Sequence, residues 1–306
     1  MTISVVVPIY GVEAYIGQCA RSLLSQSWKD TEFVFVNDGT PDRSMEVLQS
    51  VLEEFPGRDV KIVNKENGGL PQARKSGVEA SSGDYIMHVD SDDWIVPGAI
   101  EKLARKAIEK LARKAIETDA DVIHYYVRKV KADGSSHISR DKDYGDPHLY
   151  QAQMLRFHSH GFMCNKLMKR SLYAYELFWP RYNMHEDMVL SGQLLARAKT
   201  LVLIQEPLYL YRRDNPDSAS RVRTSVRRGQ SARNFLDLYE YWKGREDSPV
   251  KGFEPDFILR STWVAFTEDN TIFTERPYLK AAAKAFPLQW DCALKLHRQL
   301  ILKVLL

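Results

Sequence analysis

The chain has 306 residues, a hydrophobic fraction of 44% and a formal net charge of +3. This composition is typical of one large globular domain, or of one domain with a smaller appendage. The small charge gives no indication of nucleic acid binding, and no run of about 18 apolar residues predicts a membrane-spanning helix. The start, MTISVVVPIY, lacks the basic region of a signal peptide. Three widely spaced cysteines favour a reducing, cytoplasmic setting: Cys19, Cys164 and Cys292.

Strands and helices alternate over the first hundred residues. The pattern predicts strands at 3–10, 31–40, 60–66 and 84–94, and helices at 13–27, 42–55 and 68–81. The β-branched run at 3–10 is typical of a strand that is covered on both faces. Such alternation with short links predicts an α/β fold with a mostly parallel sheet flanked by helices. Ligands bind at the carboxyl ends of the strands in sheets of this kind.

The remainder of the chain is less regular. The octapeptide IEKLARKA occurs at 100–107 and again at 108–115, which predicts one long amphipathic helix. A strand at 120–130 and a polar loop at 131–147 are expected next. Further expectations are a helix at 149–158, a mixture of helix and loop at 161–175, a helix at 182–198, a strand-rich segment at 200–213 broken by Pro207, and mainly helices at 225–306.

Three aspartates follow the predicted strand at 84–94, in the stretch HVDSDDW. Asp90 and Asp92 straddle Ser91, and residues i and i+2 of an extended backbone point the same way. Carboxylate oxygens suit Mg²⁺ or Mn²⁺, which take one or two carboxylates alongside substrate phosphates. A solvated turn or a helix cap is the alternative interpretation of the same stretch.

Three other stretches contain candidate functional residues. Asp38 follows the second strand in FVNDGTPD, but no GxGxxG turn follows the first strand, which argues against a nicotinamide or flavin enzyme. Arg74 lies in NGGLPQARKSG, where it suits a phosphate or a base as well as an ordinary helix surface. Glu186 and Asp187 begin a helix in HEDMVL, a position that also favours acidic residues because of the helix dipole.

In this order, the stretches VVVPIYG, FVNDGTPD, NGGLPQARKSG, GDYIMHVDSDDW and HEDM resemble the family 2 glycosyltransferases. The resemblance covers roughly residues 1–215 and implies the GT-A fold. It also implies a nucleotide-sugar half at about 1–95, an acceptor half at about 120–215, and a mainly helical C-terminal extension at 216–306. Members of the family transfer a sugar from a nucleoside diphosphate sugar to an acceptor hydroxyl with inversion, and they use Mg²⁺ or Mn²⁺.

The resemblance assigns roles residue by residue. The residues implied to bind the nucleotide sugar are Pro8, Tyr10, Glu13, Asp38, Arg74, Asp90 and Arg212, with Arg213 as an alternative to the last. Asp92, with Asp90, is the implied metal ligand, and Asp93 is assigned an assisting role. Asp187 is the implied general base, with Glu186 beside it. The segment NKLMKR at 165–170 resembles the part of the family near the acceptor.

The resulting hypothesis is a metal-dependent glycosyltransferase that uses a UDP-sugar in bacterial surface polysaccharide synthesis. Its acceptor is a saccharide or a lipid-linked saccharide, and no nucleic acid partner is expected. The alternative is a degenerate sugar-nucleotide-binding or scaffold protein. The C-terminal LKLHRQLILKVLL fits a peripheral helix at the inner face of the cell membrane, or packing on the catalytic domain, which we favour. The oligomeric state is open, with a homodimer allowed.

Overall fold

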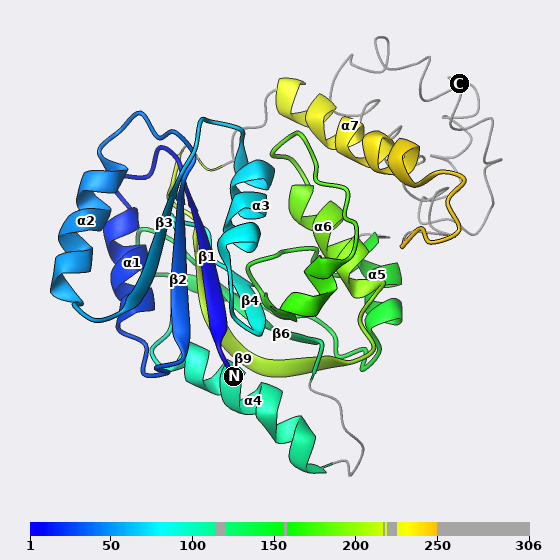
Figure 1. The fold of residues 1–306 in the computed structure, drawn as a ribbon, viewed down its shortest axis with the longest axis horizontal. Coiled ribbons are helices and arrows are strands. Elements are labelled where there is room, and N and C mark those ends of the chain that lie inside the picture. The colour runs from blue at the N-terminus through cyan, green and yellow to red at the C-terminus, as the bar shows by residue number, and fades with distance from the viewer. Residues whose placement is uncertain (114–119, 156–157, 217, 219–224, 250–306) are drawn as a thin grey trace. The chain divides into compact units, whose positions relative to one another are not determined.

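The computed structural model describes residues 1–113, 120–155, 158–216, 218 and 225–249 (Figure 1). Its contacts divide the chain into two compact units. The first comprises 1–147, 162–176 and 198–215, and the second comprises 148–161, 177–197 and 216–306. The domain boundary near residue 215 and the two halves of the catalytic domain stay predictions. The helices expected after residue 249, including the C-terminal segment, lie outside the described residues.

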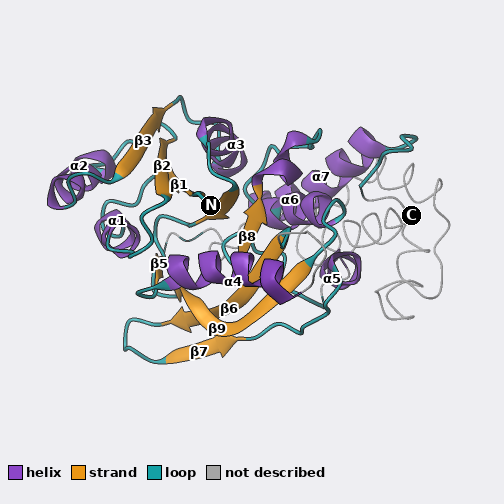
Figure 2. Ribbon diagram, turned by 60° about the horizontal axis from the view of Figure 1, so that its bottom comes forward, coloured by secondary structure: helices purple, strands orange, loops and turns teal. Residues whose placement is uncertain are grey.

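The first unit contains one mixed sheet. Its strands are β1 (Ile3–Ile9), β2 (Thr31–Asn37), β3 (Asp59–Asn64), β4 (Tyr85–His88), β5 (Trp94–Ile95), β6 (Val122–Val130), β7 (Ser136–Ser139), β8 (Lys166–Lys169) and β9 (Leu201–Arg212). The strand order is β3-β2-β1-β4-β8-β6-β9-β5, with β7 paired to β6. Strands β1 to β4 are parallel, β8 is antiparallel to β4 and β6, and β6 is parallel to β9, beside which it lies in Figure 2. The predicted α/β class is confirmed.

Helices cover both faces of the parallel part of this sheet (Figure 1). On one face, α1 (Ile16–Leu24), α2 (Ser44–Glu54) and α4 (Ala99–Arg113) contribute to one hydrophobic core that also contains Val5 and Val7 of β1. On the other face, α3 (Leu70–Ala80) packs against Val6. Because successive side chains of a strand point to opposite faces, double coverage requires the unbroken apolar run of β1.

Pro8 lies in a central strand, where its missing N–H would normally break a ladder. The carbonyl of Val6 accepts from Val89 on the β4 side, and that of Ile9 accepts from Asp38 on the β2 side. Backbone groups alternate in direction, so those of Pro8 face the β4 side. Pairing between β1 and β4 ends at Val6 and His88, which leaves Pro8 just beyond the ladder. The proline therefore lies where these two strands separate at their carboxyl ends.

Gly77 lets α3 approach β1 closely. A methyl group at this position would lie 2.3 Å from Cγ1 of Val6, far inside van der Waals contact. In α1, by contrast, a methyl group on Gly17 would meet only side-chain atoms, at 3.3 Å and beyond. We expect Gly77→Ala to destabilise the protein by about 1–3 kcal/mol through overpacking. The matched Gly17→Ala is expected to be neutral or to gain up to about 1 kcal/mol from helix propensity. Equal effects in chemical denaturation would contradict the close approach.

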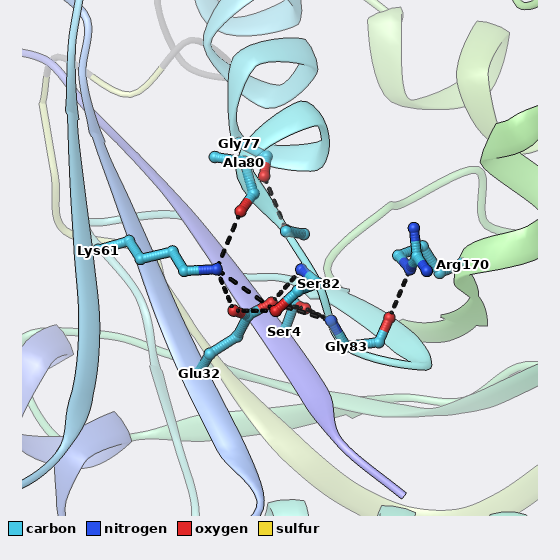
Figure 3. A network of polar contacts seen from close by, with 9 residues as sticks. Ser4, Glu32, Lys61, Gly77, Ala80, Ser82, Gly83 and Arg170 are labelled. Carbon is cyan, nitrogen blue, oxygen red and sulfur yellow. Dashed lines mark hydrogen bonds and ion pairs between the residues drawn. The ribbon is translucent and has the colours of Figure 1, made fainter.

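A buried carboxylate joins the amino ends of the parallel strands (Figure 3). Glu32 of β2 is 1% exposed and accepts hydrogen bonds from Lys61 Nζ at 2.7 Å, from the hydroxyl of Ser82 at 2.8 Å and from the backbone N–H of Gly83 at 3.0 Å. Ser4 also donates to it. Burial by itself would raise the pKa of Glu32, but these donors outweigh burial and lower the pKa to about 2.

The lowered pKa of Glu32 makes stability depend on pH. The carboxylate stabilises the folded state fully above its unfolded pKa of about 4.3, and this contribution is lost as the pH falls towards the folded value. At about 1.4 kcal/mol per pKa unit, Glu32→Gln should cost about 3 kcal/mol at neutral pH. The difference from wild type should shrink between about pH 5 and pH 2. Glu54→Gln, which removes only an exposed pair with Arg21, should change denaturation little, and a pH-independent difference for Glu32→Gln would refute the assignment.

The described part of the second unit is helical. It contains α5 (Pro147–Leu155), α6 (Glu186–Leu195) and α7 (Ser225–Trp242). Gln193 of α6 is fully buried, and its side-chain oxygen accepts from the indole of Trp242 at 2.9 Å and from the backbone of Phe178 at 2.8 Å. Gln151 of α5 donates to the carbonyl of Gly192 at 2.9 Å. Buried amides thus connect all three helices.

Besides the strand expected at 84–94, which is divided into β4 and β5, three predicted elements differ from the structure. The mixture of helix and loop at 161–175 is wrong, because Lys166–Lys169 forms β8 before a 3₁₀ turn at Arg170–Ala174. Lys166 is 1% exposed, and its ammonium donates to the carbonyl of Phe162 at 2.6 Å, so a buried lysine hides the strand pattern. The predicted loop at 131–147 contains β7. Pro207 does not break β9 but coincides with a register irregularity opposite Tyr126.

Candidate active site

The three aspartates form a turn at the carboxyl end of β4. The chain leaves the sheet after Val89, and the N–H of Asp93 donates to the carbonyl of Asp90 at 3.0 Å. The expected extended geometry at residues 90–92 is therefore replaced by a tight turn. Asp90 and Asp92 remain close enough that the charge of Asp90 raises the pKa of Asp92. The structure thus brings together the two carboxylates that the sequence pairs.

Asp90 is joined to Arg74 of α3. The guanidinium Nη2 lies 2.9 Å from Oδ1 of Asp90, and the Arg74 side chain is 2% exposed whereas that of Asp90 is 29% exposed. Arg74 lies on the buried face of α3, the helix that packs on β1. From there its side chain reaches Asp90, just after β4. The pair places a fixed positive charge beside the half-exposed carboxylate.

Asp92 is partly accessible to solvent, and its surroundings disfavour its charged form. Burial raises its pKa, and repulsion by Asp90 raises it further, although the amide of Asn215 donates to its Oδ2 at 2.8 Å. Like charges held together in a partly buried turn are typical of a site that binds a cation. Asn215 lies just after β9, and no pattern in the sequence singled it out.

Asp93 differs from the other two aspartates because β9 occupies both of its oxygens. The hydroxyl of Tyr209 donates to Oδ2 at 2.7 Å, and the backbone N–H of Arg212 donates to Oδ1 at 2.6 Å. Asp93 is 1% exposed. Burial, followed by repulsion from Asp92 and Asp90, raises its pKa well above the usual range. Sequence analysis missed Tyr209, whose only local signal is its place in the alternating stretch LYLYRR.

Arg212 is held in place at the end of β9. Its guanidinium lies 4.9 Å from the ring centroid of Tyr15 and 4.7 Å from that of Trp94, and Nε donates to the carbonyl of Asp92 at 2.8 Å. A further nitrogen donates to the side chain of Gln18. These contacts fix the arginine next to the acidic turn, whereas the neighbouring Arg213 is exposed. The predicted contact of either arginine with a diphosphate stays a prediction.

Asp38 organises the loop that leads into α3. Its Oδ1 accepts from Lys65 Nζ at 2.5 Å and from the N–H of Gly68 at 3.0 Å, and its Oδ2 accepts from the N–H of Gly69 at 2.9 Å. Gly69 has a φ of 83°, a conformation that favours glycine. The two glycines of NGG therefore bind a buried carboxylate through their backbone N–H groups. Lys65 is a further charged residue of this loop that sequence analysis did not single out.

The segment after β1 is tied to the segment after β2. Tyr10 is 52% exposed directly after a fully buried strand. The N–H of Glu13 donates to Asp42 at 2.9 Å, and the Glu13 carboxylate accepts from the N–H of Arg43 at 2.9 Å. Burial would raise the pKa of Asp42, but donors led by Ser44 and Thr40 lower it to about 2. Glu13 thus joins the segment after β1 to the segment after β2, and Pro8 and Tyr10 lie just before this connection, on the same rim as Asp38.

Glu186 and Asp187 belong to the second unit, in the first turn of α6. His185 caps this helix with a φ of 57°, which is uncommon for a residue other than glycine. Glu186 is buried, whereas Asp187 is half-buried and its Oδ1 accepts from the N–H of Met188 at 2.7 Å. The helix N-terminus favours both negative charges. Of the two, Asp187 is the more accessible to solvent.

No group of three or more His, Cys, Asp or Glu side chains is arranged to hold a metal ion in the described part of the chain. Among the same residues, no helix combines the length and apolar character that crossing a bilayer requires.

Comparison with known proteins identifies relatives. The model of glycosyl transferase family 2 matches residues 4–174. Glycosyltransferase EpsJ of Bacillus subtilis is 30% identical over 72% of this chain, and GlyG of Streptococcus pneumoniae is 31% identical over 87% of each chain. The present chain spans 63% of the length of EpsJ and 60% of that of the related EpsH.

Solved structures share the fold. TarS of S. aureus in complex with UDP-GlcNAc superposes with a TM-score of 0.67 at 17% identity, covering 94% of this chain and 80% of that one. The mannosyltransferase PcManGT of Pyrobaculum calidifontis, in complex with GDP-Man and Mn²⁺, gives a TM-score of 0.55 at 14% identity, covering 99% of this chain and 78% of that one. These similarities confirm the GT-A fold. With a family match over more than half of its length and the relative GlyG aligned over most of both chains, this chain belongs to glycosyltransferase family 2.

Proposed function

We propose that the protein is an inverting glycosyltransferase that transfers a sugar from a UDP-sugar to an acceptor hydroxyl. The observation that carries the proposal is the arrangement of Arg74, Asp90 and Asp92 at the carboxyl end of β4. In α/β sheets of this type, that rim is where ligands bind. Similar proteins support it: TarS was solved with UDP-GlcNAc, and GgaB of Bacillus subtilis, 24% identical over 71% of this chain, is named a minor teichoic acid biosynthesis protein.

The nucleotide is proposed to bind along the ends of β1, β2 and β4. Tyr10 offers an exposed aromatic ring for a base or a sugar, beside Pro8 and Glu13. Asp38 is proposed to contact uracil, although its oxygens already accept from the 65–69 loop, so that contact would use the remaining lone pairs. Arg74 and Arg212 provide positive charge for the diphosphate.

The residues present fit a divalent cation. Asp90 and Asp92 supply hard oxygen ligands, and Mg²⁺ and Mn²⁺ bound to a substrate diphosphate need only one or two protein carboxylates. When bound, the cation would act as a Lewis acid that neutralises charge on the departing diphosphate.

The acceptor is proposed to be activated by Asp187. Its carboxylate takes the proton of the acceptor hydroxyl while that oxygen bonds to the anomeric carbon and the bond to the diphosphate breaks. One base and one direct displacement invert the anomeric centre. Glu186 is proposed to support Asp187 from its buried position.

The proposed setting is the synthesis of a bacterial surface polysaccharide. The acceptor would be a saccharide or a lipid-linked saccharide on the cytoplasmic side of the membrane, where nucleotide sugars are available. For the C-terminal segment the proposal keeps packing on the catalytic domain, which we favour, and peripheral membrane contact as the alternative; the oligomeric state stays open, with a homodimer allowed.

A panel of UDP- and GDP-sugars tests the donor class. Each sugar is incubated with the full chain and Mn²⁺, and release of the nucleoside diphosphate is measured. The proposal predicts release from at least one UDP-sugar and its loss in EDTA. Release from GDP-sugars alone would mean that the donor nucleotide is GDP and not UDP. Absence of both release and nucleotide binding would favour the degenerate scaffold.

A further inference from the structure

Strand β9 holds the acidic turn through several hydrogen bonds, and the proposed chemistry gives no role to one of its side chains, that of Tyr209. The hydroxyl of Tyr209 lies between two parts of the turn. It donates to Oδ2 of Asp93 at 2.7 Å and accepts from the backbone N–H of Asp90 at 3.1 Å. Tyr209 is fully buried. One hydroxyl thus connects the first and the third aspartate, 119 and 116 residues away in sequence.

Arg212 completes this connection. Its backbone N–H donates to Oδ1 of Asp93 at 2.6 Å, and its Nε donates to the carbonyl of Asp92 at 2.8 Å. Both oxygens of Asp93 are therefore engaged by β9, and the residue is 1% exposed. Asp93 has neither the exposure nor the unoccupied oxygens of a residue that binds a substrate directly.

We infer that Asp93 and Tyr209 are positioning residues, which fix the backbone of the turn so that Asp90 and Asp92 present their carboxylates together. The inference rests on the proposed function of those two carboxylates. They repel each other, so a turn without anchors would relax by moving them apart. Backbone hydrogen bonds to Asp90 and Asp92, together with both oxygens of Asp93, oppose this movement. Partners that orient metal-binding carboxylates commonly contribute ten- to a hundredfold, roughly, to metal affinity or activity.

The chain offers a closely matched pair of variants. Tyr209→Phe removes one hydroxyl from a ring that packs in the main hydrophobic core. Tyr125→Phe removes the same atom from another fully buried ring of that core, where the hydroxyl donates to the carbonyl of Cys164 at 2.8 Å and not to a residue of the acidic turn. The two changes remove the same group from similar surroundings, and only the first touches the turn.

Two measurements test the inference on the full chain. Hydrogen exchange of the amides at 90–94 reports on the turn without any ligand. Calorimetric titration with UDP and Mn²⁺ reports on the site. We expect Tyr209→Phe to speed exchange at 90–94 and to weaken Mn²⁺-dependent UDP binding by about tenfold or more. Tyr125→Phe should leave both unchanged, even if it lowers thermal stability equally.

The outcomes separate this inference from the proposed function. If both variants match wild type in exchange and in affinity, the positioning role is refuted. Faster exchange with unchanged affinity would also overturn it, because the anchored turn would then be dispensable for binding. If wild type itself fails to bind UDP with Mn²⁺, the proposed function fails, and the exchange result alone decides whether β9 fixes the turn.

Discussion

Replacing Asp92 by asparagine should reduce transfer by about a thousandfold, since stabilisation of a leaving diphosphate by a cation amounts to several kcal/mol and each 1.4 kcal/mol is tenfold. The substitution keeps the shape of the side chain and removes its charge. In the wild type, the amide of Asn215 donates to the carboxylate at this position and stabilises it, whereas the charge of Asp90 destabilises it. An uncharged amide at position 92 does not repel Asp90, so the folded variant should be at least as stable as the metal-free wild type.

The measurement is kcat/KM for release of UDP at saturating Mn²⁺, with the melting temperature recorded beside it. Asp59→Asn is the control, because Asp59 is exposed at the start of β3, at the opposite end of the parallel strands. Wild-type activity in Asp92→Asn would remove Asp92 from the proposed site.

Replacing Asp187 by asparagine should reduce transfer by about a hundredfold to ten-thousandfold, the usual contribution of a general base. Asparagine can still accept the hydrogen bond from Met188, so the first turn of α6 is expected to persist. An amide cannot take the proton of the acceptor hydroxyl. Because the nucleotide residues belong to the other unit, UDP binding should stay nearly unchanged.

Single-turnover transfer and UDP titration, performed on the same preparation, separate these two effects. Asp237→Asn removes a half-buried carboxylate of α7 in the same unit and serves as the control. Transfer that survives in Asp187→Asn would mean that another group is the base. Loss of UDP binding together with transfer would mean that the substitution acts on folding.

The parallel half of the fold could be predicted from sequence because its signals are local. The apolar run of β1, the alternation with α1 to α3 and the turn residues of FVNDGT each identify an element without reference to a partner. Strand β8 was missed because a lysine does not indicate a buried strand position, yet Lys166 is 1% exposed and its ammonium donates to the nearby Phe162 carbonyl and Asn165 side chain. The two-residue strand β5 exists through its pairing with Leu210 and Tyr209 of β9, which lie more than a hundred residues later.

The candidate site likewise contains residues that a local sequence signal indicates and residues that depend on distant partners. Asp90 and Asp92 could be selected because their types and spacing are visible in one short stretch. Tyr209 and Asn215 could not, because their contacts with Asp90, Asp92 and Asp93 depend on β9 reaching the end of β4. The family resemblance already assigned Asp93 only an assisting role beside Asp90 and Asp92. Burial distinguishes them: Asp93 is enclosed by β9, whereas Asp90 and Asp92 remain partly accessible.

The central claim is that the acidic turn and its neighbours bind a nucleoside diphosphate together with a divalent cation. Calorimetric titration of UDP into the wild-type chain, once with Mn²⁺ and once with EDTA, tests it most directly. We predict saturable binding with Mn²⁺ that is lost or strongly weakened in EDTA. Binding of equal strength in both buffers, or no binding in either, would contradict the account.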